Sequence, residues 1–554
     1  MVIVLTLLVV GILLLSQQPA LMPFLPQPTG GGIYTEGLIG SFGRLNPLLD
    51  VGNSADRDID RLIFSGLIRF DARGNPQPDL AESWGISLDG TIYNVTIRPE
   101  AVWHDGQPVT SDDVIFTLEL MRSQASRYPQ DMRDMWGQVQ IERLDAKTVK
   151  FILPEPFAPF LDYLVFGVLP RHILGQVSAE QIPNSDFNLQ PIGSGPYKFD
   201  HLIIEDNQIA GVVLTVFEDY YGPTPYIEQI VFRYYPNGGA ALEAYQQGEI
   251  LGIGRVTADI LPDVLAEPNL SLYTGRLPRL SLVLLNLNNP EVAFFQEEDV
   301  RRALLLGLNR QWIVDRHLNG QAILADGPIL PGTWAYYESI EHIAFDPDAA
   351  KALLKSAGYV IPAGGGEARV KDNQQLSFTL LHPDDVLHTA IAQSIQTDWA
   401  AIGVVVALQP VSYDQLLNEH LVPRKYQAVL VDLDLSRSPD PDQYPFWHQS
   451  EATGGQNYSQ WDSRTASEYL EQARITVDPA VRMRLYRNFQ VVFTTELPAL
   501  PLFYPVYSYA VDIQMRGVQM APLFDTSDRF NTIFEWYLLT RRALEATSKP
   551  TAAP

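Results

Sequence analysis

Hydrophobic and polar residues alternate with two different periods along the chain, and the period indicates where strands and helices lie. Segment 92–97 (IYNVTI) alternates β-forming and polar residues, as a strand does. Segment 280–287 (LSLVLLNL) is an almost unbroken apolar run, which is typical of a buried strand. In 389–402, apolar residues recur every three or four positions, which predicts a helix. Strands that alternate with helices in this way predict α/β architecture.

Capping residues indicate where the predicted helices begin and end. Asp346 followed by Pro347 predicts the start of a helix, and Gly358 predicts its end. Asp478 begins another predicted helix in the same way. A further helix is expected over 58–68, where the apolar residues fall on one side.

Several short motifs follow one another in order along the chain. In 78–114, a Leu-Asp-Gly turn, a strand, a Trp-His-Asp-Gly turn and a polar helix start come in close succession. Later segments read PIGSGPYKF at 191–199, DVRRALLLGLN at 299–309, FDPDAAKALLKSAGY at 345–359 and SPDPD at 438–442. Taken together, these motifs resemble the extracytoplasmic solute-binding proteins of family 5, the dipeptide-, oligopeptide- and nickel-binding receptors of ABC importers.

The resemblance runs from about residue 32 to residue 537 and implies a fold. That fold is α/β and periplasmic-binding-protein-like (type II), with two lobes joined by a hinge and an extra small domain. The expected boundaries are a signal or anchor segment with its tether at 1–31, a first lobe at 32–57, 190–278 and 505–540, a small domain at 58–189, a second lobe at 279–504, and a disordered tail at 541–554.

The amino-acid composition excludes several classes of function. The chain has 554 residues, of which 46% are hydrophobic and 19% charged, as is usual for globular proteins. Its net charge of −26 argues against nucleic-acid binding, which requires a basic face. It contains no cysteine, which excludes disulfides and Cys-ligated metal centres.

The N-terminal segment indicates export. Residues 2–15 (VIVLTLLVVGILLL) are shorter than a comfortable membrane span and suit the core of a signal peptide. No Lys or Arg precedes them, and no clear cleavage site follows. Both a cleaved signal and an uncleaved anchor over residues 2–25 stay open. We expect an extracytoplasmic protein, at the cell surface or in the periplasm.

No motif in the sequence supports catalysis. The nine histidines are scattered without metal-ligand spacing, and no phosphate-binding loop is present. The Gly-Ser-Gly at 193–195 is not a nucleophile elbow, because Pro196 follows it directly. His104 is expected to make a structural hydrogen bond within its turn. We therefore predict no enzyme, no catalytic residues, no cofactor and no metal site.

The loop after the predicted strand near residue 430 is the expected ligand site. In peptide-binding members of the family, an Asp three residues before an Asp-Pro pair binds the ligand's α-ammonium group. The matching position here is Arg437, which favours a carboxylate, a phosphate or a sugar hydroxyl. Alternatively, Arg437 pairs with Asp434 or Asp440, or Asp432 or Asp434 replaces the missing acid. These alternatives stay open.

Aromatic side chains near this loop are further candidates for the ligand site, because rings stack on peptides and sugars with little loss of side-chain entropy. Trp334, Tyr444 and Trp447 are the chosen candidates, and a core role for each is an equal alternative. Tyr34 and Glu36, at the end of the first strand, are added because relatives contact ligand there.

The resulting functional expectation is a substrate-binding receptor of an ABC importer, with a ligand bound between two closing lobes. Peptides are the expected ligands, and oligosaccharides or another small solute are the alternative. A sensor without an importer would have the same fold. The expected partners are the ligand, ABC permease subunits and, through the N-terminal segment, the membrane, with no nucleic acid. The chain is expected to be a monomer.

Overall fold

The computed structural model describes residues 28–435 and 440–539. In this part of the chain one mixed sheet of 12 strands runs through the molecule, in the order β18-β17-β19-β13-β20-β11-β1-β10-β9-β8, with β12 and β14 also pairing with β20. Its strands are β1 (Ile33–Ile39), β8 (Tyr197–Glu205), β9 (Gln208–Val216), β10 (Gln229–Tyr235), β11 (Gly252–Ile253), β12 (Leu270–Arg276), β13 (Arg279–Leu285), β14 (Ala322–Leu324), β17 (Ser377–Pro383), β18 (Val405–Val411), β19 (Ala428–Asp434) and β20 (Ala499–Asp512).

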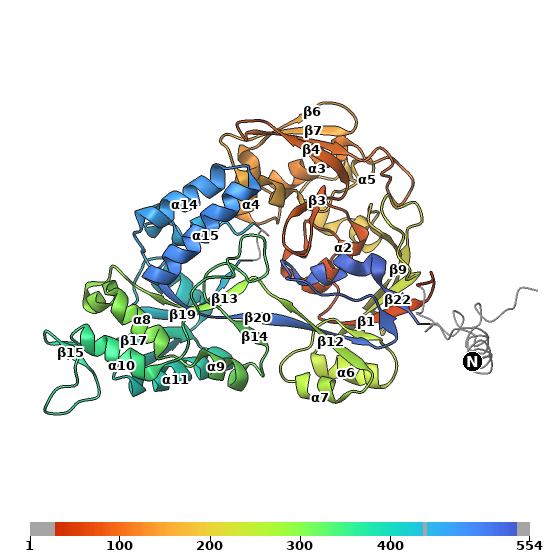
Figure 1. Cartoon of the computed structure of the whole chain (residues 1–554). Coiled ribbons are helices and arrows are strands. Elements are labelled where there is room, and N and C mark those ends of the chain that lie inside the picture. Colours follow the sequence, from red (N-terminus) through yellow and green to blue (C-terminus); the bar gives the residue numbers. More distant parts are fainter. Residues whose placement is uncertain (1–27, 436–439, 540–554) are drawn as a thin grey trace, which may run out of the picture.

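Strand β20 joins two bodies. We call the body built on β1 and β8–β12 the first lobe, and the body built on β13, β14 and β17–β19 the second lobe. The first part of β20 pairs with β13, and its last part pairs with β12, so that it crosses the middle of the molecule (Figure 1). Beside it, Leu277 and Pro278 connect β12 to β13, and the Leu277 N–H donates to the Pro505 carbonyl at 3.2 Å.

A small sheet forms the top of the molecule in Figure 1. It has the order β4-β5-β7-β6, with β4 (Ala81–Ile86), β5 (Ile92–Ile97), β6 (Gln140–Arg143) and β7 (Thr148–Ile152). Helices α3 (Ser111–Arg122), α4 (Gln130–Gln138) and α5 (Arg171–Leu174) accompany it. Its buried residues, such as Tyr93 and Phe151, belong to the same hydrophobic core as Tyr34 and Ile230 of the first lobe.

The second lobe has helices on both faces of its sheet. Helices α8 (Glu298–Leu306), α9 (Arg310–His317), α10 (Pro347–Ser356) and α11 (Val386–Ala401) lie below it in Figure 1, and α14 (Arg464–Ile475) and α15 (Pro479–Glu496) lie above. Val283 and Leu285 of β13 enter one core, whereas Leu282 and Leu284 enter the other. This burial on both faces explains the continuous apolar run of the strand.

The remaining elements are short. They include α2 (Ser54–Ile63), which follows β1, then α6 (Gly238–Gln246) and α7 (Leu261–Ala266) in the first lobe, and α12 (Tyr413–Gln415) and α13 (Tyr444–Trp447) in the second. Three two-stranded sheets are formed by β2 (Ile68–Phe70) with β3 (Pro76–Pro78), β15 (Val370–Lys371) with β16 (Gln374–Gln375), and β21 (Met515–Arg516) with β22 (Tyr537–Leu538). In the described residues, no helix combines the length and the apolar character needed to cross a bilayer.

The predicted helix starts at Asp346 and Asp478 are confirmed. The Asp346 carboxylate accepts from the Ala349 N–H at 2.8 Å, and Gly358 ends the helix with φ +95°. The helix expected over 58–68 was placed wrongly, because α2 spans Ser54–Ile63. Asn53 caps it earlier than expected, and Phe64 is extended, so the apolar residues beyond Ile63 continue into β2.

The prediction for His104 was wrong, because its side chain bonds to the Gly-Ser-Gly segment at 193–195 and not within its own turn. The Gly193 N–H donates to His104 Nδ1 at 3.1 Å, and Nε2 lies 3.1 Å from the Gly195 carbonyl oxygen. Burial lowers the pKa of His104 to about 4, so the ring is neutral at physiological pH. A Cβ on Gly193 would lie 1.9 Å from the Ile63 carbonyl oxygen, so glycine is required there.

Candidate functional site

A cavity of about 810 Å³ lies between the two lobes. The first lobe lines it with the start of α2, residues 255–258 after β11, and residues 524–526. The second lobe contributes residues 316–318 at the end of α9 and the first turn of α11. The connections between the lobes, 277–279 and the centre of β20 at 505–508, form its back. Every wall of the cavity is therefore built from segments far apart in the sequence.

A smaller hollow of about 140 Å³ adjoins this cavity, since Pro278, Asp434 and Phe524 line both. Its walls also include the 3₁₀ segment Ala158–Leu164 and residues 440–446 of the second lobe. The segment Ala158–Leu164, which follows the small four-stranded sheet, thus reaches the same region between the lobes.

Asp434 and Arg437 were predicted to face the ligand. Asp434 ends β19, is exposed and lines both hollows; its register partner across the sheet is Arg279 at the start of β13. Arg437 lies outside the described residues. The loop expected to hold the ligand thus begins, at Asp434, on the wall of the cavity.

Asp432, two residues earlier, is held by neighbours. It accepts a short hydrogen bond from Ser281 Oγ, and His388 Nε2 lies 3.6 Å from Asp432 Oδ2. Burial alone would raise the pKa of Asp432, but the bonds from His388 and Ser281 outweigh it and hold that pKa below its ordinary value. Conversely, burial would lower the pKa of His388, but Asp432 and Asp385 raise it above its ordinary value.

Ser281, Asp432 and His388 do not have the order of a hydrolase triad. In such a triad the imidazole lies between the nucleophile and the acid, so that it can take the hydroxyl proton. Here Asp432 lies between Ser281 and His388, and no hydrogen bond joins those two residues in the described structure. The cluster therefore lacks the base–nucleophile contact that acyl transfer requires.

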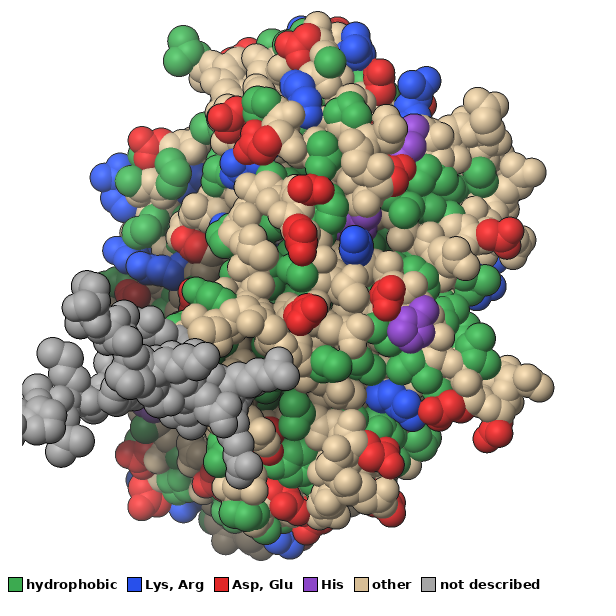
Figure 2. Space-filling model, turned by 90° about the vertical axis from the view of Figure 1, so that its right-hand side faces the viewer, with side chains coloured by type: hydrophobic (Ala, Val, Ile, Leu, Met, Phe, Trp, Pro, Cys, Tyr) green, Lys and Arg blue, Asp and Glu red, His purple; other side chains and the backbone are tan. Residues whose placement is uncertain are grey.

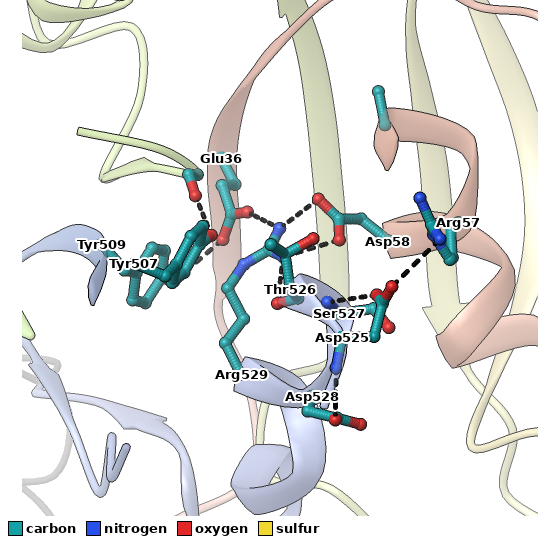
Figure 3. A network of polar contacts seen from close by, with 12 residues as sticks. Glu36, Arg57, Asp58, Tyr507, Tyr509, Asp525, Thr526, Ser527, Asp528 and Arg529 are labelled. Carbon is teal, nitrogen blue, oxygen red and sulfur yellow. Dashed lines mark hydrogen bonds and ion pairs between the residues drawn. The ribbon is translucent and has the colours of Figure 1, made fainter. Parts of the chain in front are cut away.

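Glu36 lies in a buried polar network with Asp58, Tyr509 and Arg529 (Figure 3). Tyr34 belongs to the same network through its hydroxyl. Arg529 donates to Glu36 at 2.5 Å and to Asp58 at 2.8 Å, and the hydroxyls of Tyr34 and Tyr509 each donate to Glu36 at 2.8 Å. Both Tyr34 and Glu36 are 0% exposed, so their side chains offer no surface to a ligand in this structure.

The network has a positioning role. Arg529 belongs to the 3₁₀ segment η8 (Thr526–Glu535), whose first residue lines the cavity together with Phe524 and Asp525. Asp525 also pairs with Arg57 of α2 at 3.0 Å. Burial raises the pKa of Asp58 to about 6, and Arg529 opposes that rise. Arg529 thus fixes the C-terminal wall of the cavity to β1 and α2.

The three predicted aromatic candidates pack against the second lobe. Trp334 is 7% exposed and meets Tyr486 edge-on, with ring centroids 5.7 Å apart. Trp447 is 1% exposed and packs on Phe493 at 4.8 Å. Tyr444 is half-buried and stacks on His448 at 4.0 Å. None of the three lines the two hollows described above, whereas the neighbouring Thr333, Pro445 and Phe446 line the smaller one.

Several lining residues had no signal in the sequence. They are Arg57, Arg255, Arg279, Arg316 and the segment Phe524–Thr526. They come from separate segments of the chain, and only the folded chain brings them to one cavity.

A two-lobed mixed sheet with a cavity where the lobes meet defines a binding protein of the class that closes around ligands. The family model described as "Bacterial extracellular solute-binding proteins, family 5 Middle" matches residues 75–456. Because the match covers more than half of the chain, the protein belongs to this family. The predicted family and fold class are confirmed.

Relatives and solved structures agree with this assignment. The chain is 28% identical to "Oligopeptide-binding protein AppA" of Bacillus subtilis over 92% of both chains. It is 24% identical to "Dipeptide-binding protein" of Escherichia coli, covering 80% of this chain and 84% of that one. The structure of AppA in complex with a nonapeptide matches with a TM-score of 0.64 and 26% identity, covering 93% of this chain and all of that one.

Proposed function

We propose that the protein is the substrate-binding receptor of an ABC importer and that it binds peptides in the cavity between its lobes. The observation that carries this proposal is the position of the cavity, with walls from both lobes and a back formed by the two connections between them. Relatives named for oligopeptides and dipeptides support peptides as the ligand class.

The mechanism would be closure of the lobes about Leu277–Pro278 and the centre of β20. We assign 32–57, 190–278 and 505–540 to the first lobe, 58–189 to the small domain and 279–504 to the second lobe. With these boundaries, the chain passes between the lobes only twice, at adjacent places. Two adjacent connections permit rotation about one axis, as hinge closure requires.

The proposal extends to partners and location. ABC permease subunits would recognise the closed form, and the protein would act as a monomer outside the cytoplasm. Residues 1–31 would export the chain, with residues 2–25 retained as an anchor or removed. We propose that the protein binds its ligand without catalysing a reaction. The one Ser-Asp-His cluster described above has Asp432 between Ser281 and His388 and so lacks a nucleophile–base contact.

The test is a thermal-shift and calorimetric screen of the purified full chain. The ligands are di- to nonapeptides, gluco- and xylo-oligosaccharides and metal chelates. A bound ligand raises the melting temperature through linkage, by an amount that grows with its concentration. Peptides are expected to stabilise the chain, with one site per molecule.

Stabilisation by sugars or another solute, with none by peptides, would support the alternative ligand class and contradict the peptide assignment. A variant with Phe524→Ala, at the junction of the two hollows, should weaken binding of the true ligand. Leu88→Ala, on a fully exposed turn of the small domain, is the matched control and should not.

A further inference from the structure

We propose that the cavity selects ligands with negative charge, held between the lobes by Arg255, Arg279 and Arg316. The inference rests on the function proposed above and names its ligand class: a short peptide with acidic side chains. The recognised chemistry is an oxyanion, either carboxylate or phosphate. A guanidinium group matches both, because its donors form parallel hydrogen bonds to two oxygens.

The three arginines come from both sides of the cavity. Arg255 follows β11 in the first lobe, Arg279 begins β13 at the connection, and Arg316 lies in the last turn of α9 in the second lobe. All three line the same cavity of about 810 Å³. An anion bound among them would contact both lobes at once and would therefore favour the closed form.

No ion pair is formed by these arginines within the described residues. In the described part of the chain, none of the three forms an ion pair within 4.0 Å, and all three are exposed. Two arginines of the same part of the molecule do form ion pairs: Arg57, on the same cavity, pairs with Asp525 at 3.0 Å, and the buried Arg482 pairs with Asp440 at 2.6 Å. The guanidinium donors of the three cavity arginines are thus available to a ligand.

The charge of the lining is opposite to that of the molecule. Its ionised groups are four arginines (Arg57, Arg255, Arg279 and Arg316) and two carboxylates (Asp434 and Asp525), an excess of two positive charges. Burial, followed by the charge of Arg316, lowers the pKa of His317, so that this ring adds no charge at neutral pH. The whole chain, in contrast, carries −26.

On the face shown in Figure 2, acidic groups are scattered instead of gathering at one place. Their repulsion of an approaching anion is screened over a Debye length of about 8–10 Å. Inside the cavity, attraction of the anion by the nearby arginines exceeds this repulsion. The negative surface therefore does not predict the charge of the ligand.

Apolar side chains share the cavity with the arginines. Val386 is 89% exposed and Leu387 is 37% exposed in the second lobe, and Val51 is 46% exposed in the first. Exposed apolar residues on facing walls suit a ligand that also has apolar groups. A peptide that combines acidic and apolar residues meets both requirements.

The test measures binding of three pentapeptides of the same length by calorimetry with the full chain. They carry two Glu, two Gln or two Lys among apolar residues. The Glu peptide is expected to bind at least about tenfold more tightly than the Gln peptide, which is the range for charged hydrogen bonds. The Lys peptide should bind most weakly, and the preference should shrink as salt concentration rises.

Arg255→Gln, Arg279→Gln and Arg316→Gln should each weaken binding of the Glu peptide more than binding of the Gln peptide, and so reduce the preference between the two. The matched control is Arg127→Gln, since Arg127 is exposed in the small domain and lines neither hollow. Because all four residues are exposed, the variants should fold, as circular dichroism would verify.

The outcomes separate this inference from the proposed function. If the Glu and Gln peptides bind equally and the Arg variants change nothing, the anion selectivity is overturned and the peptide receptor stands. If no peptide binds but inorganic phosphate or a tricarboxylate does, and the Arg variants abolish that binding, the anion site stands and the peptide class fails. Absence of binding by every anionic solute overturns the inference.

Discussion

At the residue scale, the neighbours of a side chain decided its role more than its residue type did. Glu36 resembles a ligand contact in the sequence but is enclosed with Arg529 in the structure. Asp432 was, with Asp434, one alternative for replacing a missing acid, and the structure shows it held by Ser281 and His388. Neither partnership is visible in the sequence, because the partners lie on separate elements, between 44 and 493 residues apart along the chain.

Loss of Arg529 should destabilise the fold. Arg529→Met leaves Glu36 and Asp58 buried without their cation, which costs about 3–5 kcal/mol of unfolding free energy. Urea unfolding would measure it. The triple variant Arg529→Met, Glu36→Gln, Asp58→Asn should recover part of the loss, and the exposed Arg516→Gln serves as the control. Equal stability of Arg529→Met and the parent would contradict the network's role.

The His388–Asp432 pair should make stability depend on pH. The folded pKa of His388 is raised, so its contribution is present below the unfolded value of about 6.5 and is lost as pH rises through the folded value. The folded pKa of Asp432 is lowered, so its contribution is present above about 3.9 and is lost as pH falls through the folded value.

The charges that face His388 are Asp385 on its own helix end and Asp432 on β19, with Arg279 acting on Asp432. His388→Asn should lower the melting temperature more at pH 5.5 than at pH 8, which a thermal melt series would measure. His201→Asn, on an exposed ion pair with Asp200, should show no such difference. Parallel pH curves for His388→Asn and the parent would contradict the assignment.

At the scale of helices and strands, capping side chains determine where helices begin. Asp346→Ala removes the side-chain acceptor at the start of α10 and should cost about 1 kcal/mol of unfolding free energy. Denaturant titration would measure this loss. Asp348→Ala, two residues further on and 91% exposed, tests whether charge alone suffices and should cost much less. An equal loss in both variants would count against capping.

The sequence prediction was wrong where a helix and the following strand share one apolar run. The segment 58–68 has helical periodicity, but the helix ends at Ile63 and the chain turns into β2. The change occurs where Gly193 and Gly195 pack on the end of α2, with the Gly195 N–H donating to the Ile63 carbonyl at 2.8 Å. A contact 130 residues away thus fixed the boundary.

At the scale of the whole molecule, the lobes should approach each other when ligand binds. The chain contains no cysteine, so Val51→Cys with Val386→Cys places two unique labels on facing cavity walls. The distance between spin labels at these positions should shorten on addition of a ligand that binds. Labels at Ile204 and Leu265, both exposed within the first lobe, should keep their distance. An unchanged Val51–Val386 distance with bound ligand would contradict hinge closure.

The sequence by itself determined the family, the α/β class and most helix and strand positions, because periodicity, caps and ordered motifs are local properties of the chain. It also led to Asp434, since the motif around 438–442 marks the loop beside it. Only the tertiary structure decided the walls of the cavity. Arg255, Arg279 and Arg316 line one cavity with no common local pattern, because strand pairing through β20 brings their segments together.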